Sequence, residues 1–349
     1  MSSHEKPPVR LQESYLAEAN RAIDFAMADD RLAKQTVRRM WLKSINELRL
    51  IYNDNFPLYL TLPGAEGRDI SLLADNNIIK LTEVGAIAPE SAHLVVAIER
   101  DKLVASELRK RYPGLSIAEV NFSEVVQGNS LLRYPGGGDK YEKFCCASVI
   151  NLDFQSTLGG FRRDGVDITF LNWIKKLSLL RESLRPSDDW CLFLTLNAVL
   201  IDNKNIDERK WQFPVNDVVN PFLYDNFIFN SEFAQKCTDV FGDEICTAIR
   251  TAQPLPMSLT VEEQQKLLMV YIPKKIASSI RGQRWSLETT YNVRYGGNDN
   301  HAPMVSWIFR FRSYRDANLH ENRVYNESLM SIFPSMVRIK DDGEIVSET

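Results

Sequence analysis

The residues best suited to chemistry lie in a short turn of small side chains. An apolar run over residues 58–62 leads into Pro-Gly-Ala-Glu-Gly at residues 63–67, and a second apolar run, over residues 94–98, ends at Glu99. In a nucleotide-binding βαβ unit, glycines let the backbone approach the ligand, and an acidic residue ending the second strand accepts hydrogen bonds from ribose hydroxyls. The spacing predicts nucleotide contacts at Gly64, Gly67 and Glu99; the alternative is a strand-to-helix turn without a ligand and a solvated strand end.

The elements that must position these residues follow a regular alternation. Helical patterns separate several of the short apolar runs, and residues 10–52 before them also have helical periodicity. Apolar strands alternating with helices indicate a parallel sheet covered on both faces, which is a doubly wound α/β architecture. The expected strands cover residues 58–62, 94–98, 116–120, 145–152 and 190–200, and the expected helices between them cover residues 69–81, 101–111 and 170–184.

The last elements of the sheet differ from the earlier ones. Residues 285–295 alternate polar and apolar side chains, residues 296–300 read Gly-Gly-Asn-Asp-Asn, and residues 305–312 run back. This pattern predicts an antiparallel β-hairpin. Five parallel strands followed by a hairpin resemble the class I (Rossmann-like) S-adenosylmethionine-dependent methyltransferase superfamily, over about residues 30 to 315.

The resemblance implies a fold and a division of the chain. It implies a doubly wound, seven-stranded, mostly parallel sheet with a C-terminal antiparallel hairpin and N-terminal helices, and S-adenosylmethionine as the cofactor. Residues 1–52 would then form an N-terminal helical segment, and residues 53–315 the methyltransferase domain with a helical insertion at 201–284. Residues 316–349 would form a C-terminal tail, which we expect to be disordered from Lys340 onward.

The glycine turn matches the family's cofactor motif in part. The family's acidic residue falls at Thr61 and its glycines at Pro63, Ala65 and Gly67, so Gly67 alone matches strictly. The resemblance assigns Glu99 to a contact with the ribose, and Asn121 and Phe122, which follow the third strand, to contacts with the adenine. The implied cofactor contacts are Thr61, Gly64, Ala65, Gly67, Glu99, Asn121 and Phe122.

A polar motif follows the fourth apolar run. Residues 151–154, Asn-Leu-Asp-Phe, are similar to the Asn/Asp-Pro-Pro-Tyr/Phe signature of amino methyltransferases that act on DNA, RNA or protein, although both prolines are absent. The resemblance implies that Asn151 or Asp153 orients the target amine toward the methyl carbon and that Phe154 stacks on a flipped base. The alternative is a buried strand that ends in an Asn/Asp cap.

Residues 31–49 of the helical pattern before the sheet carry a basic stripe, and this stretch contains a single acidic residue, Glu47. Such a stripe is a candidate contact for nucleic-acid phosphates, and the alternative is a solvated helix face. The residues proposed to contact nucleic acid are Arg31, Lys34, Arg38, Arg39 and Lys43.

Bulk composition excludes several other classes. The 349 residues are 44% hydrophobic and 25% charged, and the net charge of −4 offers no general attraction to nucleic acid or anionic lipid. No membrane-length apolar stretch and no signal-peptide core are present, so we expect a cytoplasmic protein without a membrane segment. The five cysteines are expected to be core thiols, and the four histidines have no metal-ligand spacing, so no metal site is predicted.

Two function classes follow from these patterns. The first is an enzyme that transfers a methyl group from S-adenosylmethionine to an exocyclic amine, such as that of a nucleic acid. The second is a module that keeps the fold, with its cofactor motif eroded at Thr61 and Pro63, and acts as a binding or assembly subunit of a larger complex. A nicotinamide-dependent oxidoreductase is less supported, because the glycine turn lacks that class's full pattern and no Tyr-x-x-x-Lys helix is evident.

Overall fold

The computed structural model describes most of the chain. The residues described are 32–52, 58–64, 66–127, 147–157, 162–163, 167–184, 188–198, 223–224, 230–253, 259–297, 302–314 and 321–348. The helices are α2 (Leu32–Ile51), α3 (Arg68–Asp75), α4 (Lys102–Arg111), α5 (Phe122–Gln127), α7 (Thr169–Leu184), α9 (Ser231–Phe241), α10 (Asp243–Arg250), α11 (Val261–Ser279) and α12 (Glu321–Met330). The strands of the main sheet are β1 (Tyr59–Thr61), β2 (Val95–Ile98), β3 (Ser116–Ala118), β4 (Val149–Thr157), β7 (Trp190–Asn197), β8 (Trp285–Tyr295), β9 (Met304–Ser313), β10 (Met336–Ile339) and β11 (Ile345–Ser347), and β5 (Arg162–Arg163) and β6 (Asp167–Ile168) form a separate two-stranded sheet.

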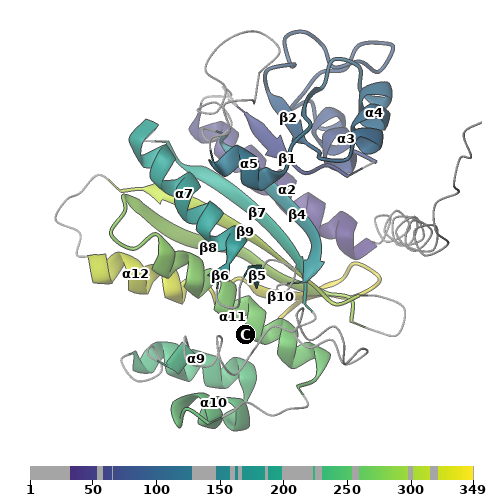
Figure 1. The fold of residues 1–349 in the computed structure, drawn as a ribbon. Coiled ribbons are helices and arrows are strands. Elements are labelled where there is room, and N and C mark those ends of the chain that lie inside the picture. The colour runs from purple at the N-terminus through teal and green to yellow at the C-terminus, as the bar shows by residue number, and fades with distance from the viewer. Residues whose placement is uncertain are drawn as a thin grey trace, which may run out of the picture.

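The described part has a mixed α/β architecture around one nine-stranded, mostly parallel sheet, whose arrangement can be followed in Figure 1. The strand order is β11-β10-β8-β9-β7-β4-β1-β2-β3. Strands β3, β2, β1, β4 and β7 pair in parallel, β9 lies antiparallel between β7 and β8, and β10 pairs in parallel with β8. From β1 the chain adds strands on one side up to β3 and then on the other side from β4 onward. The winding therefore reverses between β1 and β4, and ligands of open α/β sheets bind at the carboxyl ends of the strands at such a point.

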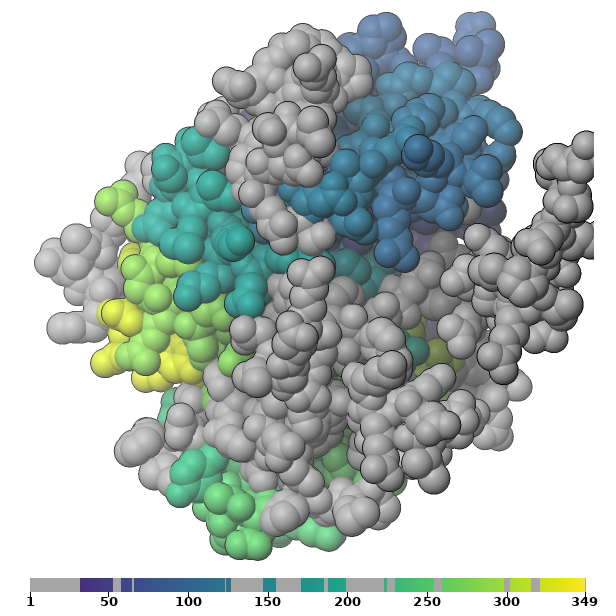
Figure 2. Space-filling model, in the orientation of Figure 1, coloured from purple at the N-terminus to yellow at the C-terminus, as the bar shows by residue number. Residues whose placement is uncertain are grey.

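Helices cover both faces of the sheet. Apolar residues of α2, α3 and α4 form one buried cluster with one face, and those of α5, α7, α9, α11 and α12 form a second cluster with the other. Trp41 of α2 stacks on Phe193 of β7, with 5.7 Å between ring centroids. Helices α9 and α10 lie at the end of the molecule farthest from β2 and α4 (Figure 1 and Figure 2).

The prediction of a mixed α/β sheet is confirmed, and so is the antiparallel hairpin, which is β8 and β9. Each of the five earlier apolar runs contains a strand, and the central ones are mostly apolar because both of their faces are buried. The described residues of the expected helical insertion include α9, α10 and α11. Among the helices described, none has the length and apolarity that a membrane span requires.

The C-terminal tail differs from the expectation. Instead of disorder from Lys340, residues 321–348 form α12, β10 and β11, and the sheet has nine strands rather than seven. Strand β10 has only four residues, so its two-residue period is too short to recognise in the sequence. It is held by parallel pairing with β8 and by burial of Met336 and Ile339 in the two cores.

We expect Phe333→Ala to lower the free energy of unfolding by about 3–5 kcal/mol, as large-to-small core substitutions do. Phe333 is buried between α12 and β10 and packs edge-to-face on Phe233, with centroids 5.5 Å apart. Urea unfolding measures the change, and Arg323→Ala on the exposed face of α12 is the control, with an expected loss under about 1 kcal/mol. A similarly small loss for Phe333→Ala would show that the C-terminal segment is not docked.

Candidate functional site

The carboxyl ends of β1 and β2 lie side by side at the point where the winding reverses, next to the first half of β4. Thr61, the last residue of β1, pairs in register with Ala97 of β2 and with Asn151 of β4. Gly64 and Glu99 follow these strand ends within three residues. The structure therefore brings the glycine turn, Glu99 and the start of the polar motif to one edge of the sheet.

The two glycines of the turn have different surroundings. Both are left-handed, with φ of 59° at Gly64 and 56° at Gly67, and the Gly67 amide donates to the Gly64 carbonyl at 3.3 Å. A Cβ atom on Gly67 would lie 2.7 Å from Tyr112 Cε2, so this glycine allows α4 to pack against the start of α3. A Cβ atom on Gly64 would meet nothing within 4 Å, so open space adjoins the backbone there. Ala65 lies outside the described residues.

A carboxylate that the sequence analysis missed lies beneath this turn. Asp69, in the first turn of α3, is 5% exposed and accepts a hydrogen bond from Thr61 Oγ1. Its other oxygen accepts from the Ile70 amide at 3.0 Å. Acidic residues are common in the first turn of a helix, so Asp69 itself did not indicate a buried site in the sequence. The one signal for it was Thr61, a polar residue at the end of an apolar strand.

Burial raises the pKa of Asp69 above its usual value. The hydrogen bond from Thr61, the positive charge of Arg38 and the Ile70 amide act in the opposite direction, and the charge of Asp153 raises the pKa further. The folded protein therefore binds a proton at Asp69 more readily than the unfolded chain does. Asp69 in its charged form therefore lowers the stability of the folded protein.

The polar motif on β4 does not converge on one point. Asn151 is 1% exposed and donates from Nδ2 to Tyr59 Oη at 3.0 Å, beneath α3. Asp153 lies on the same face and forms a 2.7 Å ion pair with Lys34 of α2. Phe154 points to the opposite face, where its ring lies 6.4 Å from that of Trp173 on α7.

The motif residues point in different directions because β4 continues through the motif to Thr157. Successive side chains of a strand point to opposite faces, so residues 151 and 154 separate. The prolines of the amino methyltransferase signature would interrupt a strand here, and their absence allows the pairing with β7 to extend through Asp153. A common amine site of Asn151, Asp153 and Phe154 therefore does not form.

Glu99 and Asn121 lie at the ends of β2 and β3 with their side chains accessible. Glu99 is half-buried and accepts from the Asp101 amide at 2.8 Å, and burial is the main cause that raises its pKa. Asn121 is exposed and donates from Nδ2 to Glu124 at 3.0 Å. Phe122 is buried instead, packed edge-to-face on Trp173, so it belongs to the core.

The basic stripe on α2 is divided between two directions. Lys34 and Arg38 are buried against the sheet edge, where Lys34 pairs with Asp153 and Arg38 acts on Asp69. Arg39 and Lys43 are exposed, and Lys43 Nζ lies 5.9 Å from the ring centroid of Tyr291. Arg31 lies outside the described residues. Among the residues that the structure describes, no group of three or more His, Cys, Asp or Glu side chains could hold a metal ion.

Comparisons with protein-family models, with curated proteins and with solved structures found no match to this chain.

We expect Asp69→Asn to become more stabilising, relative to the wild type, as the pH rises. In the unfolded chain Asp69 releases its proton near the ordinary pKa of 3.8, whereas in the folded protein its pKa is higher. The free energy of unfolding of the wild type therefore falls as the pH rises from 3.8 through the pKa of the folded state. Asparagine does not titrate, so the variant lacks this loss. Urea unfolding at about pH 4 and pH 7.5 measures the difference.

Glu262→Gln is the control with the opposite sign. Hydrogen bonding to Lys266 is the main cause that lowers the pKa of Glu262, so its contribution is present above the ordinary value of 4.5 and is lost as the pH falls. This variant should become less stable than the wild type as the pH rises. If the difference in stability between Asp69→Asn and the wild type did not change with pH, this would contradict a buried Asp69 whose pKa is raised.

Gly67→Ala should destabilise the protein more than Gly64→Ala. Both substitutions force alanine into the left-handed region, which costs roughly 1–2 kcal/mol. At Gly67 the new methyl also meets Tyr112, and overpacking adds at least about 1 kcal/mol. Thermal and urea unfolding compare the pair, and equal losses would show that α4 does not pack closely on the turn.

Proposed function

We propose that this protein is an S-adenosylmethionine-dependent methyltransferase, with its cofactor at the carboxyl ends of β1 and β2. The observation that carries the proposal is the strand arrangement. Five parallel strands wind in two directions from β1, and an antiparallel strand, β9, is inserted between β7 and β8. This arrangement agrees with what the resemblance to class I methyltransferases implies about the hairpin, and β10 and β11 would be additions beyond it.

The residues at this edge fit an adenosyl cofactor. Gly64 leaves open space beside a left-handed backbone, so a ligand can approach the main chain there. Glu99, half-buried at the end of β2, has the position and acceptor capacity to bind ribose hydroxyls, and Asn121 follows the next strand with an exposed amide. When bound, S-adenosylmethionine supplies an activated methyl group, so the protein's part is to bind and align the reactants.

The geometry supports the cofactor half of this proposal more strongly than the acceptor half. Asn151 is buried and Phe154 faces α7, so neither lies where a base could stack beside the cofactor. Asp153 is the motif residue that we propose as the acceptor of a hydrogen bond from a target amine, held in place by Lys34. The exposed Arg39 and Lys43 are the part of the basic stripe that remains proposed for nucleic-acid phosphates.

Two observations favour the second candidate, a module without catalysis in a larger complex. Thr61 occupies the position at the end of β1 where the methyltransferase motif has an acidic residue. The nearby carboxylate of Asp69 already accepts hydrogen bonds from Thr61 and from the Ile70 amide. The ion pair with Lys34 also neutralises Asp153. A module would need this edge only as a rigid part of the fold, and its partners would be other proteins.

Calorimetry with S-adenosylmethionine and S-adenosylhomocysteine separates the two candidates. For the enzyme we expect a dissociation constant on the order of micromolar, weakened about tenfold or more by Glu99→Ala, because charge-assisted hydrogen bonds to ribose are lost. Gly64→Ala should also weaken binding, since its methyl group would fill the open space beside the backbone.

Glu107→Ala on the exposed face of α4 is the matched control and should leave the affinity unchanged. The absence of heat with the wild type would contradict the enzyme proposal and favour the module. Binding that Glu99→Ala leaves intact would contradict the location of the cofactor.

A further inference from the structure

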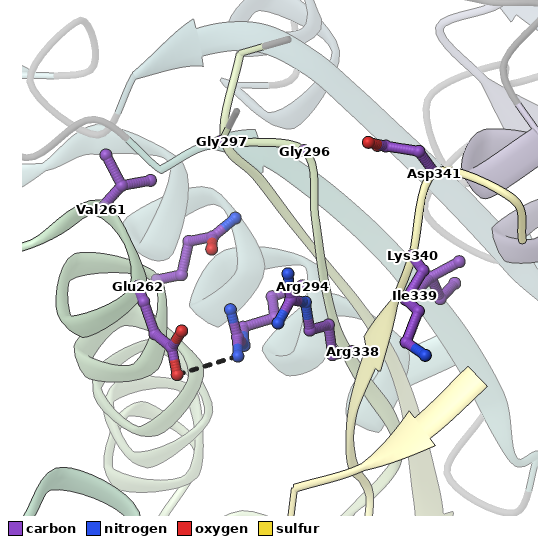
Figure 3. Close-up of a pocket in the computed structure, with 10 residues that line it drawn as sticks. Val261, Glu262, Arg294, Gly296, Gly297, Arg338, Ile339, Lys340 and Asp341 are labelled. Atoms are coloured by element: carbon purple, nitrogen blue, oxygen red, sulfur yellow. Dashed lines mark ion pairs between the residues drawn. The ribbon is translucent and has the colours of Figure 1, made fainter. Parts of the chain in front are cut away.

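A cavity lies at a different part of the same sheet edge, between the first turns of α11 and the carboxyl ends of β8 and β10 (Figure 3). Its volume is about 330 Å³, within the range of small-molecule sites. In the sheet order, β4, β7 and β9 separate β8 from β1, so this cavity shares no residue with the edge around Gly64 and Glu99. Its charged lining residues are Glu262, Arg294, Arg338, Lys340 and Asp341.

Two arginines on neighbouring strands lie directly opposite each other in the lining of the cavity. Arg294 of β8 and Arg338 of β10 are register partners in a parallel pair, so their side chains leave the same face of the sheet, and both line the cavity (Figure 3). Lys340, two residues beyond Arg338, also lines it. Like charges placed opposite each other in a sheet are destabilising unless a negative charge lies between them.

The protein neutralises one of these arginines and not the other. Arg294 is 4% exposed and binds Glu348 through two bonds, Nε to Oε2 at 2.5 Å and Nη2 to Oε1 at 2.7 Å, and its Nη2 also lies 3.0 Å from Glu262 Oε1. Arg338 is exposed and forms no ion pair with any carboxylate in the described part of the chain. The cavity therefore presents a guanidinium whose charge has no direct counterpart.

Neither acidic residue of the lining forms an ion pair with Arg338. Glu262 is engaged by Lys266 and Arg294, and the hydrogen bond from Lys266 is the main cause that lowers its pKa, although the charge of Arg338 also helps to lower it. Lys340 pairs with Glu344 in an exposed contact, which contributes little to holding the lysine in place. Arg338, in β10, and Lys340, just after it, are thus two cations of the lining that an anion in the cavity would bridge.

We propose that this cavity binds a small organic phosphate, with the phosphate group held by Arg338 and Lys340. A doubly charged phosphate matches two neighbouring cations, and guanidinium binds phosphate oxygens in a bidentate manner. The cavity is larger than an inorganic ion needs, and the carboxylates of Glu262 and Asp341 line the rest of it. These carboxylates accept hydrogen bonds, so they favour a hydroxylated organic group on the phosphate.

Calorimetry of the full chain with glycerol 3-phosphate tests the site, at an ionic strength held constant with sodium chloride. We expect glycerol 3-phosphate to bind more tightly than inorganic phosphate, and uncharged glycerol not to bind. Arg338→Ala should weaken glycerol 3-phosphate binding about tenfold or more, and Arg338→Lys should weaken it less, because it keeps the charge without the bidentate geometry.

Arg312→Ala is the matched control, because Arg312 is an exposed arginine that pairs with Ser286 at the opposite end of β8 and forms an ion pair with Glu288. It should leave phosphate binding unchanged. Since Arg338 is exposed, circular dichroism should show a folded Arg338→Ala protein that binds S-adenosylmethionine as the wild type does.

Three results would overturn the proposal. They are no heat with glycerol 3-phosphate, equal affinity in Arg338→Ala and the wild type, and affinity for inorganic phosphate equal to or tighter than for the ester. None of them bears on the cofactor edge at β1 and β2, so failure here is distinguishable from failure of the proposed methyltransferase function.

Discussion

Strand β1 is three residues long, and the arrangement at the centre of the molecule depends on how those residues are held. Tyr59–Thr61 pairs with β2 on one side and β4 on the other, so it sets the register of both halves of the sheet. A strand this short has few ladder hydrogen bonds of its own. Asp69 reaches back from α3 to Thr61 and, with Tyr59 and Asn151, forms a buried polar cluster that joins the helix to β1 and β4. The turn with Gly64 is fixed at both ends by this cluster.

The same cluster explains why the site differs from its sequence motifs. A charge buried among apolar helices must be paired or hydrogen-bonded, and here Thr61, Asn151 and Asp153 each contact a polar group from another element. Lys34 and Arg38 are one helical turn apart on α2, so they reach the edge together, at Asp153 and near Asp69. What the sequence presents as a basic stripe is in part the positive half of an internal charge arrangement. A methyltransferase would use this arrangement to hold Asp153 in place, whereas a module would use it only to stabilise the fold.

The predictable part of the fold is the part governed by burial on both faces. Mostly apolar segments such as Trp190–Asn197 identify central strands without any knowledge of their partners. Strands β10 and β11 were beyond prediction, because four and three residues carry too little periodicity and depend on pairing with β8. The network around Asp69 was also beyond prediction, since it joins Thr61, Asp69 and Asn151 through a fold rather than through spacing. The opposite directions of Asn151 and Phe154 follow from two-residue alternation once β4 is known to extend past the motif.

The position of β9 has a consequence for the order in which the protein is made. This strand fills the gap between β7 and β8, and Phe311 pairs with Trp190 across about 120 residues of sequence. Until the ribosome has synthesised β9, one edge of the mostly apolar strand β7 has no partner, and such an edge is a template for aggregation. Such long-range closure also slows folding. We therefore expect the nascent chain to need chaperone protection during the synthesis of its second half, a demand that arises from topology and applies whatever ligand the finished protein binds.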